Sequence, residues 1–311
     1  MTLRSAQLTV DLLPDRGADV HAVVDRATGI DVLFKTPWGR RESVPPGASS
    51  EVGWLARYSG GWQQLLPNAG PARMQDGVEL GYHGEAAVVP WTVLEAAPNR
   101  ARLAVDLFTS PLRLERTVRV DGGRLSIRDV VRNLGQDPVG VRWVQHPAFG
   151  APFIDGRCRI DSSAASFLSD AEMPGTGVDR DTLAPFPTLP GVVGRDLRDV
   201  AGADEVRAVF GALTDFAGEA WFSVSSPSAG FGVRVAWDAA VFPHAWFWQE
   251  CHATAGFPWF RRAYVVAVEP ANILPGEGRC GALRRGDTPL LAAGASWASE
   301  LSMSRFELGA T

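Results

Sequence analysis

Three ionisable side chains stand where a folded chain could use them for proton transfer: His83, His146 and Glu269. His146 and Glu269 each end an apolar run and each precede a proline, Pro147 and Pro270. Because a proline cannot continue a central ladder, we expect both groups at strand ends. A carboxylate there is costly to bury unless it is paired or functional. The pattern predicts acid–base chemistry near neutral pH, where histidine titrates.

The third group, His83, lies in the turn-like segment Gly81–Gly84, just before a predicted strand. By contrast, His21 lies inside an alternating strand pattern and is interpreted as structural. Taken singly, a histidine at a strand end or a glutamate before a proline is ordinary structure or surface. Their combination in one chain is what favours a catalytic set.

Aromatic residues favour a sugar as the ligand. The chain contains 11 Trp, and three of them lie within residues 242–260. Aromatic faces stack on the C–H faces of sugar rings, while the indole N–H can donate a hydrogen bond. Strand alternation places Trp246 and Trp248 on one face, and Phe247 and Gln249 on the other. A plain core cluster would have the same composition, so both interpretations stay open.

The elements that must position these residues are predicted to be β-strands. Leu112–Val120 alternates apolar and polar residues, the turn residues 121–123 follow, and the alternation resumes at Leu125. This pattern is typical of a β-hairpin. Further strands are predicted at Gln7–Leu13, Asp19–Asp25, Ala86–Ala96, Ala101–Phe108, Gly140–Gln145, Ala220–Ser225, Gly230–Trp237, Tyr264–Glu269 and Trp297–Phe306.

Helical signals are weak along the chain, with Asp199–Phe210 as the best short candidate. The segment Asp170–Ala203 is rich in Pro, Gly and Asp and is predicted to be a functional loop or a lid. Many strands at fairly even spacing favour an all-β antiparallel sandwich or barrel over a βαβ architecture. No linker is evident, so residues 1–311 are expected to form a single domain.

Composition narrows the function classes. The net charge of -5, without a run of basic residues, argues against nucleic acid as a partner. Three cysteines without CxxC spacing predict neither a disulfide framework nor a zinc site. The first residues do not resemble a signal peptide, and no apolar stretch approaches the roughly 20 residues that span a bilayer. We expect a cytoplasmic protein, a monomer or a homodimer.

At these residues the chain resembles the galactose mutarotase-like superfamily, in particular the aldose 1-epimerases. Gly60–Gly70 is similar to the family's early glycine-rich segment, and Tyr82–Gly84 to its first histidine motif. Gln145–Gly150 resembles the second histidine motif, and Val268–Pro270 the carboxylate–proline motif near the C-terminus. The four motifs occur in the family's order, and Gly294–Leu308 resembles its closing strand.

The resemblance implies a large antiparallel β-supersandwich with a sugar cleft on its concave face. It implies that Glu269 is the general base that takes the anomeric hydroxyl proton. His146 would be the general acid that protonates the ring oxygen, with His83 assisting by a hydrogen bond near that oxygen. The expected partner is a small sugar, and no metal or nucleotide cofactor is expected, because proton transfers suffice.

The chain also departs from the family pattern. The sugar-binding arginine that usually follows the family's asparagine is missing after Asn68, and Arg57 or Arg73 is the expected replacement. An arginine in the cleft would suit an anionic sugar. Asp215 is the candidate for the family's substrate-binding aspartate, by rough position. The predicted substrate-binding residues are therefore Arg57, Asn68, Arg73, Asp215, Trp248 and Gln249.

Two other functions remain open from the sequence. The Trp-rich segment and the missing binding aspartate are also consistent with a carbohydrate-binding protein without turnover. A lyase or hydrolase on a sandwich of the same type is a third alternative. The chain length and the absence of a recognisable secretion signal argue against it, because polysaccharides are usually met outside the cell.

Overall fold

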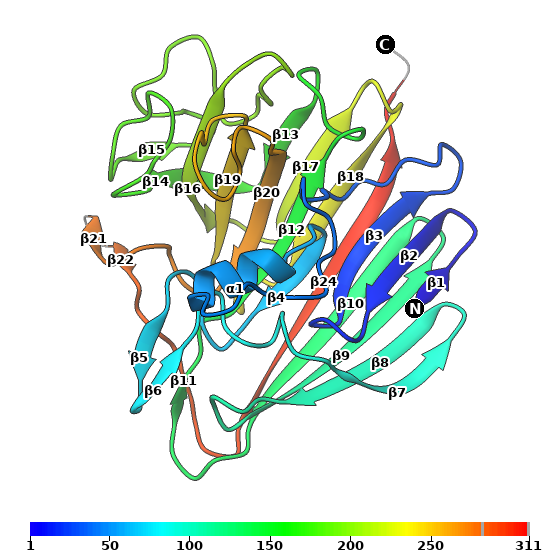
Figure 1. Cartoon of the computed structure of the whole chain (residues 1–311). Coiled ribbons are helices and arrows are strands. Elements are labelled where there is room, and N and C mark those ends of the chain that lie inside the picture. The colour runs from blue at the N-terminus through cyan, green and yellow to red at the C-terminus, as the bar shows by residue number, and fades with distance from the viewer. Residues whose placement is uncertain (281–282, 310–311) are drawn as a thin grey trace.

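Two large antiparallel sheets dominate the structure, a computed structural model that describes residues 1–280 and 283–309 (Figure 1). In spatial order, the ten-stranded sheet contains β1 (Thr2–Arg4), β2 (Leu8–Leu13), β3 (Asp19–Asp25), β4 (Trp62–Leu65), β12 (Val144–Gly150), β20 (Tyr264–Ala271), β19 (His244–Cys251), β16 (Arg207–Phe216), β14 (Ala164–Ser169) and β15 (Leu183–Pro185). The eight-stranded sheet contains β13 (Arg159–Ser162), β17 (Ala220–Ser226), β18 (Phe231–Trp237), β24 (Ser296–Glu307), β10 (Arg124–Asn133), β9 (Leu112–Asp121), β8 (Arg100–Asp106) and β7 (Thr92–Ala97). The predicted all-β antiparallel architecture is confirmed.

Smaller elements lie around the two sheets. They are the strand pairs β5 (Arg73–Gln75) with β6 (Val78–Leu80), β11 (Val139–Gly140) with β23 (Leu290–Leu291), and β21 (Gly278–Cys280) with β22 (Leu283–Arg285), and the helix α1 (Ser50–Arg57). No helix in the described part of the chain is long and apolar enough to cross a membrane.

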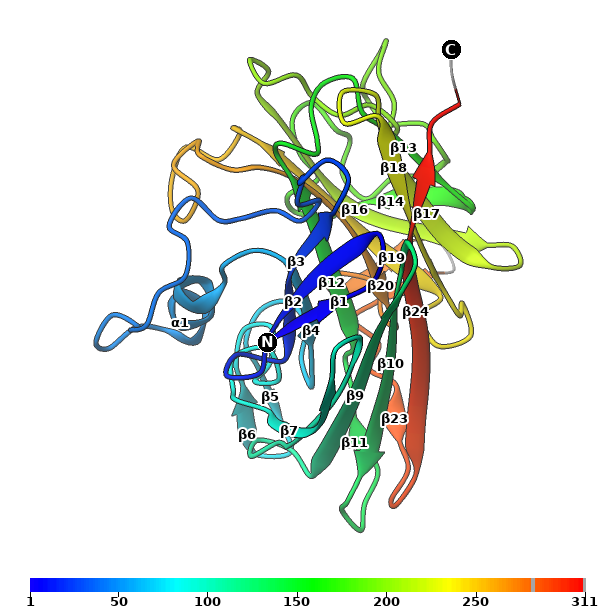
Figure 2. The ribbon, with the colours of Figure 1, turned by 90° about the vertical axis from the view of Figure 1, so that its right-hand side faces the viewer.

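The main core lies between the facing surfaces of the two sheets, where alternate residues of each strand are buried. The predicted hairpin is confirmed: β9 and β10 pair, with Leu125 opposite Val120. A second, smaller cluster lies on the other surface of the ten-stranded sheet, beneath α1. Figure 2 shows α1 on this outer side, away from the eight-stranded sheet. The ten-stranded sheet is therefore covered on both faces, and the site described below lies under α1.

A buried ion pair within the eight-stranded sheet lies directly behind the strand that carries His146, and its hydrogen bonds to Gln64 and Gln145 link the two sheets. Arg116 donates to both carboxylate oxygens of Asp129, at 2.8 and 2.9 Å, and neither side chain is exposed. Arg116 also donates to Gln64 at 2.7 Å, and Gln145 donates to Asp129 at 2.8 Å. Such a pair is stable in the interior only when further hydrogen bonds satisfy both groups, as they do here. The network fixes β12 from the core side.

The structure corrects the predicted helix at Asp199–Phe210. Residues 207–216 form β16, which pairs with β14 and β19 over most of its length, and the residues before it form a loop. Long-range strand pairing outweighs a short helical pattern. The strand predicted at Ala86–Ala96 begins later than expected, because residues 86–88 form a turn and β7 starts at Thr92.

Helix α1 begins with a local signal, a capping residue at its N-terminus. Ser49 caps it, because the Ser49 Oγ accepts a hydrogen bond from the Val52 N–H at 3.3 Å. A helix of eight residues is marginal in isolation. Burial of Trp54 and Leu55 against the outer face of the sheet stabilises it.

The segment predicted as a functional loop or lid is attached to the edge of β16. Phe210 N–H donates to the Pro174 carbonyl at 2.8 Å, and Thr176 N–H donates to the Ala208 carbonyl at 2.8 Å. Gly175 between them has a φ of +121°, and a Cβ there would lie 2.1 Å from the Ala208 oxygen. Only glycine fits this approach, so the segment stands as a fixed wall of the site.

Candidate functional site

His146 and Glu269 lie inside two neighbouring central strands, β12 and β20, whereas their following prolines predict strand ends. The two strands pair at Val144 with Ala271 and again at Ala148 with Ala267. The register is unshifted, so His146 and Glu269 are directly opposite each other within an unpaired interval of three residues. Both prolines fall in this interval, where no N–H needs to be donated across the pair.

The two side chains meet at a distance of 3.5 Å between His146 Nε2 and Glu269 Oε1. Both are buried, at 6% and 2% exposure. Burial raises the pKa of Glu269 well above its usual range and lowers the pKa of His146 to about 4. The cause is desolvation, which disfavours the charged form of each group. Without substrate, burial therefore favours the uncharged carboxyl and the neutral imidazole over an ion pair of the two groups.

His83 approaches the same point from a loop above the sheet. Its ring lies 6.4 Å from that of His146, centroid to centroid. Gly70 N–H donates to His83 Nδ1 at 3.0 Å, and His83 N–H donates to the Gly70 carbonyl at 3.0 Å. Since Nδ1 accepts, the neutral ring carries its proton on Nε2. Burial and the neighbouring His146 hold the pKa of His83 well below its usual value, so His83 is a fixed neutral donor.

The loop geometry depends on two further residues of the sequence motifs. Asn68 is fully buried and its amide donates to the carbonyls of Pro71 and Gly81, at 2.8 and 3.0 Å. Gly84, at a φ of +70°, is so close to Leu66 that a Cβ would lie 2.4 Å from the Leu66 oxygen. Both residues act on the position of His83.

The three groups lie at a cavity of about 960 Å³. Aromatic rings form much of its lining: Trp54, Tyr58, Tyr82, Phe210, Trp246, Trp248, Phe257 and Trp259. Trp248 is 6.0 Å from His146 and 5.5 Å from Trp259, and Tyr58 is 5.7 Å from His146, centroid to centroid. A cavity of this volume with aromatic walls and a few convergent polar groups is typical of a small-molecule site.

The charged lining of the cavity is mostly acidic. Glu51 and Glu172 are exposed at its edge, and Glu250 is buried and accepts the Ala253 N–H at 2.7 Å. Within the described lining, Arg180 is the cation, and its side chain is exposed. Apart from the reacting groups, the described lining therefore has three carboxyl side chains and one guanidinium.

The predicted substrate-binding residues divide into two groups. Trp248 lines the cavity, and Gln249 borders it, although its Nε2 donates away to the Asp199 carbonyl at 3.2 Å. The other four are not among the described lining residues: Arg57, Asn68, Arg73 and Asp215. Asn68 instead supports the loop of His83 through its two amide hydrogen bonds.

Each of the two arginines forms a hydrogen bond with a residue outside the cavity lining. Arg57 donates to the Val88 carbonyl at 3.2 Å, and Arg73 donates to Thr288 at 3.0 Å. Asp215 is exposed at the end of β16, with a φ of +59°. None of these three side chains lines the cavity. The described lining therefore gives no support for Arg57 or Arg73 as the residue that binds an anionic sugar.

Trp54 and Tyr58 are among the lining residues that the sequence predictions did not name. Both come from α1 and the residue that ends it, and their rings stack at 4.9 Å. Their spacing of four residues, shortly after the capping Ser49, is a helical signal that could have located them. The sequence prediction placed its short helix candidate at Asp199–Phe210 instead of here.

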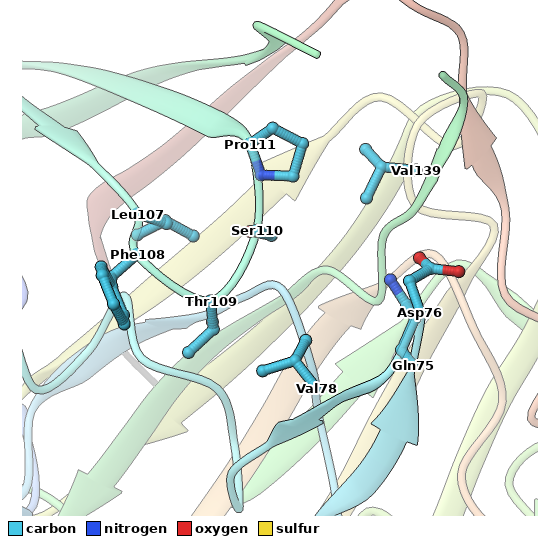
Figure 3. A pocket seen from close by; sticks show the side chains of 9 residues that line it. All are labelled: Gln75, Asp76, Val78, Leu107, Phe108, Thr109, Ser110, Pro111 and Val139. Atoms are coloured by element: carbon cyan, nitrogen blue, oxygen red, sulfur yellow. The ribbon is translucent and has the colours of Figure 1, made fainter. Parts of the chain in front are cut away.

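A smaller cavity of about 390 Å³ lies between the β5–β6 hairpin and the loop before β9 (Figure 3). Its described lining includes Phe108, Pro111 and Val139 and has one ionisable side chain, Asp76. It therefore lacks the paired acid and base of the larger cavity. Elsewhere in residues 1–280 and 283–309, no three His, Cys, Asp or Glu side chains come together as metal ligands.

A family profile described as a domain of unknown function, DUF4432, matches residues 1–304. The chain belongs to the DUF4432 family. A comparison of this DUF4432 chain with curated protein sequences found no match.

Solved structures show the fold that the DUF4432 chain shares. A galactose mutarotase-like protein from Clostridium acetobutylicum has a TM-score of 0.68 at 15% identity, over 99% of this chain and 95% of that one. A galactose mutarotase related enzyme from Lactobacillus acidophilus has a TM-score of 0.66 at 15% identity, over 99% and 97%. An aldose epimerase homologue from C. elegans has a TM-score of 0.62 at 17% identity, over 99% of both chains. The DUF4432 chain therefore has the galactose mutarotase-like β-sandwich fold.

Proposed function

We propose that this DUF4432 protein interconverts the α and β anomers of an aldose or aldose derivative by acid–base ring opening. The contact that carries the proposal is the pair His146 and Glu269, 3.5 Å apart at the floor of an aromatic cavity. The names of the structural neighbours point to the same chemistry. At their low identity they support the fold, and the reaction itself is our proposal.

The proposed reaction needs one base and one acid. Glu269 takes the proton of the anomeric hydroxyl, His146 gives a proton to the ring oxygen, and the bond from the anomeric carbon to the ring oxygen breaks. Rotation about the C1–C2 bond exposes the other face of the carbonyl. The hydroxyl formed from the ring oxygen then attacks that face and returns its proton to His146, while Glu269 gives its proton to the carbonyl oxygen, which becomes the new anomeric hydroxyl.

The pair shares one proton, which suits a reversible reaction. Burial favours this proton on Glu269 before the sugar binds, whereas ring opening by the steps above starts with it on His146. The pair has the same total charge whether the proton is on Glu269 or on His146. A sugar hydroxyl between the two groups can therefore accept a proton from one and donate its own to the other. The pair therefore titrates as a unit.

His83 would hold the ring oxygen in this scheme. Its Nε2–H is fixed by the Gly70 hydrogen bond to Nδ1 and is neutral because the ring is buried. A neutral donor can stabilise a developing negative charge on oxygen without giving up its own proton.

The lining of the cavity supports an uncharged aldose as the substrate. Aromatic rings can stack on the apolar faces of a pyranose. The carboxylates of Glu51, Glu172 and Glu250 would repel a phosphorylated or acidic sugar, and the exposed Arg180 is the cation that opposes them in the described lining.

NMR exchange spectroscopy on pure anomers of neutral, phosphorylated and acidic sugars tests the proposal. We expect the wild-type chain to accelerate anomer exchange of at least one neutral aldose above the buffer rate. An unaccelerated exchange for every sugar in the panel would overturn the enzymatic function. New reducing ends or an unsaturated sugar product would favour a hydrolase or a lyase instead.

A carbohydrate-binding protein without turnover is the second candidate. The observation that favours it is the burial of Glu269, which raises the pKa of its carboxyl and disfavours the ionised form that a base needs. In this case a sugar binds in the aromatic cavity with no exchange by the wild type, and binding persists after Glu269→Gln.

A further inference from the structure

Helix α1 and the residue that ends it place two aromatic side chains over the cavity. Trp54 and Tyr58 are one helical turn apart, and their rings stack at 4.9 Å with an interplanar angle of 23°. The backbone N–H of Tyr58 donates to the Trp54 carbonyl at 2.8 Å and closes the last turn. Both side chains line the cavity and are almost fully buried, at 5% and 4% exposure.

The backbone of Tyr58 is held from two directions. Its carbonyl accepts a hydrogen bond from Trp38 Nε1 at 2.9 Å and another from Thr36 Oγ1 at 3.2 Å. The carbonyl of the preceding Arg57 accepts from the Arg16 guanidinium at 3.0 Å. Together with the stacked ring, these contacts leave the phenol little freedom, so its hydroxyl has a defined position.

The hydroxyl of Tyr58, by contrast, has no hydrogen-bond partner among the described residues, although it is buried. The indole N–H of Trp54 is likewise buried without a hydrogen-bond partner among the described residues. The phenol of Tyr264, on β20, shows the usual arrangement, because it donates to the Ala201 carbonyl at 2.5 Å. Buried polar groups are nearly always paired, so an unpaired hydroxyl on a residue that lines a cavity is a candidate to bind a ligand there.

The unpaired hydroxyl lies close to the reacting pair. The Tyr58 ring meets the His146 ring edge to face at 5.7 Å, and the charge of Glu269 acts on the phenol. The four polar residues expected to bind the sugar from loops and strands are absent from the described lining: Arg57, Asn68, Arg73 and Asp215. Tyr58 therefore occupies a position where a polar contact to the sugar is needed.

We propose that the Tyr58 hydroxyl hydrogen-bonds an oxygen of the sugar bound beside His146 and Glu269, and so selects among sugars by the hydroxyl at that position. The proposal rests on the proposed function for the class of ligand. A phenol both donates and accepts a hydrogen bond and carries no charge, which suits a sugar hydroxyl. A site that hydrogen-bonds a substrate hydroxyl discriminates strongly against the analogue that lacks it.

The test is Tyr58→Phe, which keeps the stacked ring and removes only the oxygen. We expect kcat/KM for the preferred aldose to fall about 10- to 100-fold, mainly through a higher KM, as for the loss of one hydrogen bond in a buried site. The matched control is Tyr264→Phe, which removes a phenol oxygen away from the cavity and is expected to leave kcat/KM unchanged.

A panel of monodeoxy sugars separates a direct contact from a structural effect. The deoxy sugar that lacks the contacted oxygen should give the same kcat/KM with wild type and Tyr58→Phe. The other deoxy sugars should keep the full difference between the two proteins. Equal kcat/KM for wild type and Tyr58→Phe with every sugar, or a uniform loss with every sugar, would overturn the inference.

Sugar binding gives a readout that does not require turnover. If the wild type binds a sugar but catalyses no exchange, the proposed function fails, and the Kd from tryptophan fluorescence takes the place of KM. We then expect a weaker Kd for Tyr58→Phe, and an equal Kd would overturn the inference alone. A wild type that binds no sugar in the panel contradicts both.

Discussion

His146 and Glu269 are directly opposite each other on adjacent strands, in an interval of three residues where β12 and β20 are not paired. Each residue is followed by a proline, and both prolines lie in that interval. The missing N–H groups are thus placed where the ladder is already open. The pattern of an ionisable residue followed by a proline therefore occurs in both strands at the interval where they are not paired.

The pH dependence of activity should be bell-shaped and should belong to the pair. Below about pH 4, His146 is protonated as well as Glu269, so the pair holds two protons and neither group can act as a base. Above the raised pKa of Glu269, the pair loses its last proton, and no acid remains. We expect kcat/KM to be highest between these limits, measured as anomer exchange after subtraction of the buffer rate.

Circular dichroism across the same pH range is the control for unfolding. An acid limb with its midpoint at about 6.5, the value of an exposed histidine, would contradict the lowered pKa of the buried His146 in the free enzyme.

The variant His83→Asn should separate the role of the His83 Nε2–H as a donor to the substrate from the role of Nδ1 as the acceptor of the Gly70 N–H. The side-chain oxygen of the introduced asparagine can accept the Gly70 N–H as Nδ1 does, and asparagine tolerates the φ of +57° found there. The variant lacks the Nε2–H donor. We expect kcat/KM to fall about 10- to 100-fold, as for the loss of one hydrogen bond to the substrate, with little change in Tm. Wild-type kcat/KM in this variant would remove His83 from the site.

The buried ion pair behind β12 should be essential for stability. Arg116→Met leaves the Asp129 carboxylate buried without its cation, and we expect the free energy of unfolding to fall by about 3–5 kcal/mol. Arg119→Met is the matched control on the same strand, because Arg119 is exposed in its pair with Asp121, and a change below about 0.5 kcal/mol is expected. Equal effects of the two changes in urea unfolding would contradict this role.

Much of the fold was open to prediction from the sequence because it depends on local alternation. The β9–β10 hairpin follows from residues that alternate along each strand and from turn residues between them. The three candidate catalytic residues could be singled out because motifs preserve residue type and order. Their meeting in space depends on β12 and β20 being neighbours, which residue spacing alone does not determine.

The parts that escaped prediction depend on contacts between distant segments. Helix α1 is short, and its stability comes from burial of Trp54 against a sheet whose strands come from distant parts of the chain. The side chains of Arg57 and Arg73 have partners in segments that the sequence does not place near them. The wall at Gly175 depends likewise on the edge of β16.

The most direct test of the proposed function is anomer exchange by Glu269→Gln, measured with sugar binding in the same samples. Glutamine keeps the shape of the side chain but cannot take a proton, so we expect exchange to fall by about 10²–10⁴-fold. The Kd for the sugar should change little, because the aromatic walls are intact. Exchange at the wild-type rate in Glu269→Gln would contradict the proposed catalytic role of Glu269.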